Sequence, residues 1–279
     1  MDARIVTVAA SGSESETVLA RSGNLVVFIA TAPADIAAAQ RLRYDVFYRE
    51  MAATSSPEMA ASGRDFDRYD DYCDHMLVAD TSKRDANGAP LIVGCYRLLR
   101  SEVAARHGGF YTSGEYDISA MLARGGPDAR YLELGRSAVR AEYRTGPVMQ
   151  FLWRGLVIYL LRHEIALMFG CASLPGIDPN DLKRELSFLH HFHAMPPEIR
   201  VRARPELFVD MNLMPKEAID EQEALRELPP LIKGYVRAGA SIGDGAVIDH
   251  QFGTTDVFIY FPVSRIDPRY IAFFKRRSG

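Results

Sequence analysis

Acidic side chains are concentrated in one short polar segment of the chain. Asp65, Asp67 and Asp70 lie within six residues of one another, beside Tyr69 and Asp71. Carboxylates this close repel one another, so either solvent or cations must neutralise them. A solvated surface loop would explain an isolated acidic segment, whereas a cationic ligand would explain one that belongs to a functional site.

A second segment has the layout of an anion-binding site. A predicted strand, residues 131–139, is followed by a polar turn with Arg140, Arg144 and Gly146, and Pro147 then stands at a helix start. Unpaired backbone N–H groups at a helix start point toward an anion, and neighbouring arginines add charged donors. The turn could therefore hold a phosphate, and a plain loop of the same composition is the alternative.

The strand before this turn carries a carboxylate among apolar residues. Glu133 alternates with Leu132 and Leu134, and Ala138 is expected on the same face as the two leucines. This pattern predicts a half-buried strand with the glutamate on its other face. A carboxylate in such a position can accept a proton as a general base.

The composition is that of an ordinary globular protein. The chain has 279 residues, of which 48% are hydrophobic and 25% charged, and a formal net charge of −3. This balance argues against a general nucleic-acid binder, and three cysteines fit a reducing compartment better than a disulfide scaffold. The first two dozen residues lack a signal-peptide pattern. Charges interrupt the most apolar run, residues 151–174, so we expect it in a protein core rather than in a membrane.

Hydrophobic patterning predicts strands and helices in mixed order, without a linker between domains. Strands are expected at residues 25–30, 75–80, 90–99, 131–139, 166–172 and 256–261, and helices near residues 36–47, 147–160, 178–192 and 228–240. We predict a single α+β domain, residues 25–279, with a mostly antiparallel central sheet flanked by helices. Residues 1–24 are expected to form a flexible N-terminal segment.

Several segments in the right order resemble a known family. The first set is Arg43-Tyr44 with Phe47, the aspartates at 65, 67 and 70, residues 94–98 and residues 133–136. Together these resemble the acyl-carrier-protein-dependent branch of the GNAT acyltransferases, which includes the acyl-homoserine-lactone synthases and the ornithine N-acyltransferases of ornithine-lipid synthesis. Later segments are similar to the second group: residues 152–155, residues 170–174 with Asp178-Pro179, and residues 229–235 with Asp244 and Asp249. The resemblance covers about residues 26–272 and implies the GNAT fold.

The resemblance also implies the acyl donor. The turn at residues 140–147 has less glycine than the usual GNAT phosphate loop, so we expect no bound cofactor. The implied donor is a 3-hydroxyacyl or other long acyl chain on the phosphopantetheine of acyl carrier protein. That partner is acidic, so a local basic face is expected. Contacts to the acyl-phosphopantetheine or its carrier are assigned to Arg140, Arg144, Gly146, Trp153 and Arg154, and for the arginines a solvated helix face is the alternative.

The implied reaction is attack of an amine on a thioester, which needs a base and stabilisation of an oxyanion. Glu133 is the candidate base, with Arg136 also assigned to catalysis. A structural ion pair of Glu133 with Arg97 or Arg136 is the alternative. Acids and arginines of the substrate site would pair with one another or bind the ammonium and carboxylate groups of ornithine. The expected substrate-binding residues are Arg43, Phe47, Asp65, Asp67, Asp70 and Arg97.

Two other features that could carry chemistry are expected to be structural. His190, His191 and His193 are too close together on a predicted helix to converge on one ion, so no metal site is expected. Cys171 has apolar neighbours and is expected to be a buried, inert thiol.

The sequence therefore predicts a cytoplasmic N-acyltransferase that moves a 3-hydroxyacyl chain from acyl carrier protein to the α-amino group of L-ornithine, giving lyso-ornithine lipid. No nucleic-acid partner is expected. Three alternatives stay open: an acyl-homoserine-lactone synthase using S-adenosylmethionine, acylation of another amino acid such as glycine, and a non-catalytic acyl-carrier or lipid-binding module. The product is amphipathic, so we also expect loose contact with the inner membrane face, favoured by Lys275, Arg276 and Arg277.

Overall fold

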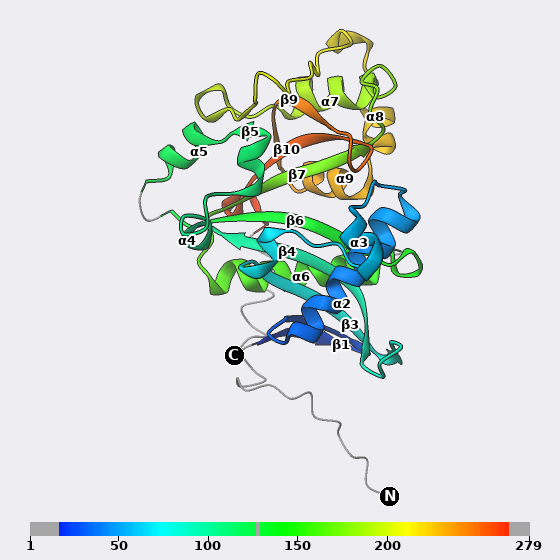
Figure 1. Cartoon of the computed structure of the whole chain (residues 1–279). Helices are drawn as coiled ribbons and strands as arrows, with labels where there is room; N and C mark the ends of the chain where they lie inside the picture. The colour runs from blue at the N-terminus through cyan, green and yellow to red at the C-terminus, as the bar shows by residue number, and fades with distance from the viewer. Residues whose placement is uncertain (1–16, 127–128, 145, 268–279) are drawn as a thin grey trace, which may run out of the picture.

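The computed structural model describes residues 17–126, 129–144 and 146–267 (Figure 1). The strands are β1 (Val18–Ser22), β2 (Leu25–Ile29), β3 (Asp74–Arg84), β4 (Pro90–Arg100), β5 (Tyr116–Asp117), β6 (Tyr131–Val139), β7 (Leu167–Pro175), β8 (Arg202–Ala203), β9 (Ser241–Asp249) and β10 (Thr254–Pro262). The α-helices are α2 (Pro33–Tyr44), α3 (Pro57–Ser62), α4 (Ser101–Ala104), α5 (Ser119–Arg124), α6 (Pro147–Arg162), α7 (Lys183–His193), α8 (Glu221–Glu227) and α9 (Pro230–Arg237). The π-helix η1 (Asp45–Glu50) continues α2, and the 3-10 helices that bear on the site are η2 (Arg68–Asp71), η3 (Tyr111–Gly114) and η4 (Ala141–Tyr143).

The strands form one sheet in the order β1-β2-β3-β4-β6-β7-β10-β9-β8-β5. Most neighbours are antiparallel, while β6 and β7 are parallel, as are β8 and β9. Helices flank this sheet (Figure 1). The predicted α+β class with a mostly antiparallel central sheet is therefore confirmed.

Helices cover both faces of the sheet because apolar residues alternate along its strands. In β10, Val257 and Ile259 join the core cluster that contains α6 and α9, whereas Phe258 packs on the opposite face. Residues of α2 belong to a third cluster, which includes Leu77 of β3, while Met76 packs with α6. The helices α6 and α2 therefore lie on opposite faces. Proline at the first position of both helices loses no hydrogen bond there.

A β-bulge interrupts β6. Its pairing with β4 shifts register between Cys95 and Arg97, which inserts one extra residue into β6. Arg136 lies in this bulge with a φ of 51°. The bulge changes the direction of the later side chains, so Leu134 packs on the α6 face and Ala138 on the α2 face. The expectation that these two residues share a face is therefore wrong.

The parallel strands β6 and β7 separate after a short paired stretch. The last matched positions are Glu133 and Phe169. At the next residue, a Cβ atom on Gly170 would lie 2.3 Å from the carbonyl oxygen of Leu134. Glycine is required there because any side chain would push the strands apart before they diverge. Beyond this point, the edge of β6 that faces β7 is open.

Other expectations differ in detail from the structure. Residues 131–134 of β6 are all buried, so β6 is a central strand rather than a half-buried one. Strand β1 pairs with β2, and the expected boundary at residue 24 therefore falls inside a β-hairpin. Among the residues described, no helix combines the length and hydrophobicity needed to span a membrane. The basic residues 275–277 lie outside the described part of the chain.

Candidate active site

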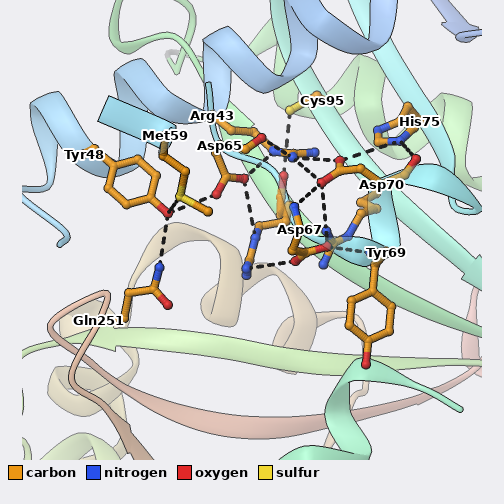
Figure 2. A network of polar contacts seen from close by, with 12 residues as sticks. Arg43, Tyr48, Met59, Asp65, Asp67, Tyr69, Asp70, His75, Cys95 and Gln251 are labelled. Carbon is orange, nitrogen blue, oxygen red and sulfur yellow. Dashed lines mark hydrogen bonds and ion pairs between the residues drawn. The ribbon is translucent and has the colours of Figure 1, made fainter. Parts of the chain in front are cut away.

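The acidic segment is folded around Arg43 (Figure 2). This side chain is only 1% exposed, and its Nε donates to Asp65 Oδ2 at 2.6 Å. Its Nη2 donates to Asp70 Oδ1 at 2.7 Å. Burial alone would lower the pKa of Arg43, but the two carboxylates raise it above its ordinary value. Arg43 is therefore a buried cation with both of its charge partners inside the protein.

Two more arginines complete a closed ring of alternating charges with the same aspartates. Arg97 Nη1 donates to Asp67 Oδ1 at 2.6 Å and lies 3.5 Å from Asp70 Oδ2. Arg136 lies 3.3 Å from Asp67 and 3.5 Å from Asp65. Burial raises the pKa of Asp67, but Arg97 and Arg136 bring it below the ordinary value. We call these six residues the charge ring: Arg43, Asp65, Arg136, Asp67, Arg97 and Asp70.

The charge ring joins four parts of the fold. Its arginines come from α2, β4 and the bulge of β6, and its aspartates come from η2 and the loop before it. Asp67 and Asp70 also form the capping box of η2, in which each carboxylate accepts a backbone N–H of the turn. With three arginines and three aspartates, the ring as a whole is neutral. It fixes Arg136 next to the point where β6 and β7 separate.

A cavity of about 390 Å³ occupies the gap between β6 and β7. Its lining includes residues from the core clusters on both faces of the sheet, so the cavity passes between the strands from one face to the other. The polar half is lined by Thr112, Glu133, Arg136, Cys171, Asp249 and Asp256. The apolar half is lined by Met149, Met168, Leu231, Tyr235, Ile259 and Phe261. Such a cavity fits a ligand with one charged end and one hydrocarbon end.

Glu133 lies in the polar half with both carboxylate oxygens held by backbone amides. The N–H of Tyr111 donates to Oε2 at 2.9 Å and that of Thr112 donates to Oε1 at 2.6 Å. Within the described residues, Glu133 is held by these amides and forms no ion pair with Arg97 or Arg136, unlike the structural alternative. Burial raises the pKa of Glu133, since the low-dielectric interior disfavours its charged form. A carboxylate held in place with a raised pKa is suited to general-base catalysis near neutral pH.

Three carboxylates meet at the far side of the polar half, and we call them the acidic cluster. Ligand oxygens of Glu115, Asp249 and Asp256 all lie within 4.8 Å of one another. None of the ion pairs found in the described part of the chain involves them, unlike the aspartates of the charge ring. Burial raises the pKa of Glu115 to about 7 and also raises that of Asp256. The charged forms of Glu115 and Asp256 are therefore disfavoured in the protein alone, and a cationic group of a ligand would stabilise them.

The turn before α6 uses its arginines partly for local structure. Arg140 Nε donates to the carbonyl of Ile92 at 3.0 Å, and Arg144 Nε donates to that of Val139 at 3.0 Å. Arg144 also pairs with Glu50 of η1, with Nη2 donating to Oε2 at 2.8 Å. Gly146, with a φ of 104°, precedes the first residue of α6. Of the five residues assigned to the acyl-carrier contact, Arg144 alone is among the residues that line the cavity.

The aromatic candidates lie on different sides of the cavity. Phe47, in η1, lines the cavity and packs edge-on against Phe252 at 5.5 Å. Trp153, in α6, packs against Tyr235 at 5.6 Å behind the cavity wall. Arg154, the next residue of α6, is partly buried.

Residues expected to be structural have identifiable surroundings. The rings of His190 and His191 on α7 are nearly perpendicular to each other. His191 Nε2 lies 3.0 Å from the carbonyl oxygen of Met214. The Cys171 thiol donates to Glu115 at 3.1 Å. Burial and the nearby acids raise the pKa of Cys171 well above its ordinary value, so the thiol stays protonated and a poor nucleophile. The acidic cluster, in contrast, has the oxygen ligands that a divalent cation prefers.

The structure therefore brings most of the expected residues together but divides their roles. Glu133, Arg136, Arg97 and Phe47 line the cavity, whereas Arg43 and the three aspartates of the charge ring hold these elements in place. Sequence reasoning missed the acidic cluster. Of its members, Asp249 alone carried a signal, as part of the family pattern.

The diverging parallel strands, with a buried carboxylate at the point of divergence and a helix starting beside the cavity, define an acyltransferase of the GNAT class. Residues 42–154 match the family model described as Acetyltransferase (GNAT) domain. The chain is 48% identical to the L-ornithine N(alpha)-acyltransferase of Rhizobium meliloti (strain 1021), over 98% of this chain and 90% of the relative. It is 49% identical to that of Brucella abortus (strain 2308), over 92% of this chain and 91% of the relative. The chain belongs to the L-ornithine N(alpha)-acyltransferase family.

Solved structures give a more distant comparison. FeeM, an N-acyl amino acid synthase from uncultured soil microbes, matches with a TM-score of 0.47 and 10% identity over 88% of this chain and 92% of that chain.

Proposed function

We propose that this protein transfers a 3-hydroxyacyl chain from the phosphopantetheine of acyl carrier protein to the α-amino group of L-ornithine, giving lyso-ornithine lipid. The observation that carries this proposal is the two-sided cavity, whose polar half is lined by the buried carboxylate of Glu133 and by Asp249 and Asp256 of the acidic cluster. Ornithine has a side-chain ammonium that matches this cluster, and the apolar half matches a long acyl chain. The relatives named above are ornithine acyltransferases, which supports the same acceptor.

The reaction follows from the positions of the residues in the polar half. Glu133 takes a proton from the α-ammonium, directly or through a water molecule, and the freed amine attacks the thioester carbonyl carbon. Backbone N–H groups on the open edge of β6 are candidates to stabilise the oxyanion of the tetrahedral intermediate. The C–S bond then breaks as the amide forms, and the phosphopantetheine thiolate leaves and takes up the proton that the attacking nitrogen loses.

Substrate orientation is assigned to charged groups on either side of the base. The acidic cluster would bind the side-chain ammonium of ornithine. Arg136, which lines the cavity, would face its α-carboxylate, because a guanidinium suits carboxylate geometry. The rings of Tyr111 and Phe252 lie 5.3 Å and 4.9 Å from the Arg136 guanidinium and restrict its position. In this proposal, the aspartates of the charge ring position Arg136 and Arg97 and do not touch the substrate.

The donor side of the proposal assigns the cavity mouth to acyl carrier protein. Arg144 lies at the cavity, Arg140 precedes it, and Gly146 leads into α6, so acidic carrier residues would find positive charge and helix N–H groups there. Charge reversal at Arg144 should raise the KM for acyl carrier protein without changing the rate with a short pantetheine thioester. Reversal of Arg184, which pairs with Glu223 on the distant α7–α8 surface, is the matched control. We further propose that the protein acts in the cytoplasm, in loose contact with a membrane that takes up the amphipathic product.

The direct test is product analysis with purified protein. It would be incubated with 3-hydroxyacyl-acyl carrier protein and either ornithine, glycine or S-adenosylmethionine, and the products identified by mass. An N-acyl product that depends on ornithine is expected. Product with glycine or a lactone instead would overturn the acceptor assignment, and no product with any acceptor would favour a non-catalytic binding module.

A further inference from the structure

Three hydroxyl-bearing side chains meet inside the apolar half of the cavity. They are Tyr96 of β4, Ser137 of β6 and Tyr235 of α9, and all three line the cavity. The two tyrosines are only 5% and 4% exposed. The Tyr96 hydroxyl lies close enough to Ser137 and Tyr235 for both to affect its pKa. We call these three residues the hydroxyl trio.

The surroundings of the hydroxyl trio are apolar. Tyr235 packs edge-on against Trp153 at 5.6 Å and against Phe261 at 6.4 Å. Other lining residues of this half are methionines, leucine and isoleucine. Burial raises the pKa of Tyr96 and raises that of Tyr235 well above its ordinary value, so both remain protonated donors. Hydroxyl groups in such a place lose hydration, and an alkyl chain offers them nothing in return.

The bulge in β6 explains why a hydroxyl lies on this side of the sheet. The extra residue at Arg136 places Ser137 beside Tyr96, whose ring belongs to the core cluster of the α6 face. Ser137 follows Arg136 directly and lies two residues beyond Gly135 on the open edge of β6. The hydroxyl trio is therefore close to the point where the strands separate, near the thioester end of a bound acyl chain rather than at the far end of the chain.

We propose that the hydroxyl trio binds a hydroxyl group near the thioester end of the acyl chain and so selects hydroxylated over unsubstituted donors. This inference rests on the proposed function, because it assigns the apolar half to the acyl chain. A site that hydrogen-bonds a substrate hydroxyl discriminates strongly against the analogue that lacks it, since its own polar groups are then left unpaired. The hydroxyl trio would thus determine donor specificity without taking part in the chemical step.

The test compares kcat/KM for 3-hydroxyacyl-acyl carrier protein and the unsubstituted acyl-acyl carrier protein of equal chain length, with ornithine in excess. The wild-type protein should prefer the hydroxylated donor. Tyr235→Phe and Ser137→Ala should each reduce this preference by about 10- to 100-fold, the range for an unmatched buried hydrogen-bonding group. Tyr260→Phe, on the other face of β10, is the matched control and should leave the preference unchanged. Circular dichroism and thermal melting would confirm that each variant is folded.

A binding measurement separates this inference from the proposed function. Displacement of a fluorescent fatty acid by 3-hydroxy and unsubstituted fatty acids of equal length reports selectivity without turnover. Selectivity for the hydroxylated acid that is lost in Tyr235→Phe and Ser137→Ala would support the hydroxyl trio even if no ornithine product formed. Equal discrimination in the wild type and both folded variants, in either assay, would overturn the inference.

Discussion

Replacing Asp256 with asparagine removes one negative charge from the acidic cluster with little change in shape. The carboxylate accepts a hydrogen bond from Thr254 Oγ1 at 2.9 Å, and an amide oxygen can accept the same bond. Burial raises the pKa of Asp256, so its charged form is disfavoured in the folded protein. The neutral amide should therefore leave the melting temperature unchanged or slightly higher at pH 8.

The expected loss of activity comes from one charge-assisted hydrogen bond to the side-chain ammonium of ornithine. Such a bond contributes about 1.5–3 kcal/mol. At about 1.4 kcal/mol for each factor of ten, the kcat/KM for ornithine should fall roughly 10- to 150-fold. Norvaline has the same carbon skeleton without the side-chain ammonium, so its kcat/KM should be low in the wild type and unchanged or slightly higher in Asp256→Asn.

The assay therefore measures kcat/KM for ornithine and for norvaline with one acyl donor held in excess. Asp244→Asn is the matched control, because Asp244 lies in the neighbouring strand β9 and pairs with Arg202 at the surface. It should change neither value. Equal losses for ornithine and norvaline in Asp256→Asn would refute the assignment, since they would show a general structural effect rather than the loss of an ammonium contact.

Four further predictions follow from the contacts of the site. Glu133→Gln should lower kcat about 10²- to 10⁴-fold with little change in ornithine binding; a normal single-turnover rate would exclude the base role. Burial raises the pKa of Glu115 to about 7, and this carboxyl faces Cys171, Asp256, Asp249 and Glu133. Ornithine binding, measured by calorimetry, should therefore tighten as the pH rises through about 7 and Glu115 loses its proton. Glu115→Gln should remove this pH dependence, and a dependence that persists in the variant would contradict the role of Glu115. Gly170→Ala should lower stability by about 1–3 kcal/mol in urea denaturation because of the clash with the Leu134 carbonyl; an unchanged midpoint would show that β6 and β7 can separate freely. Arg43→Met should lower the free energy of unfolding by about 3–5 kcal/mol, because two buried carboxylates lose their partner. Arg49→Met, at an exposed ion pair, should lower it by less than about 1 kcal/mol. Equal effects of the two substitutions would contradict the structural role of the charge ring.

Much of the fold follows from local patterns in the sequence. The apolar runs that become β2, β3, β4, β6, β7 and β10 are visible as strands, and Pro147 marks the start of α6. The order of family segments adds the GNAT class. Local patterns do not predict the bulge at Arg136. It arises because β4 and β6 pair with one residue out of register, and it decides which face each later side chain of β6 occupies.

The sequence predicts most residues of the candidate site, but not which of them pair with one another. The clustered aspartates suggest a cation, and the sequence left open whether protein or substrate supplies it. In the structure the cations are arginines of the protein itself, from α2, β4 and β6, because these elements pack around η2. The acidic cluster is harder to foresee, since Glu115, Asp249 and Asp256 come from separate segments that only the sheet order brings together.

The passage of the cavity between β6 and β7 has a consequence for the order of events. In the proposed binding mode, the charged substrate lies on one face of the sheet and the acyl chain on the other, so neither would occupy the path of its partner. Both can be bound at once, and no covalent acyl-enzyme is needed to hold one while the other enters. Initial rates should therefore follow a sequential rather than a ping-pong pattern. In that mode the finished product would span the sheet, with its head group and tail on opposite sides, and would have to be withdrawn lengthwise before the next cycle begins.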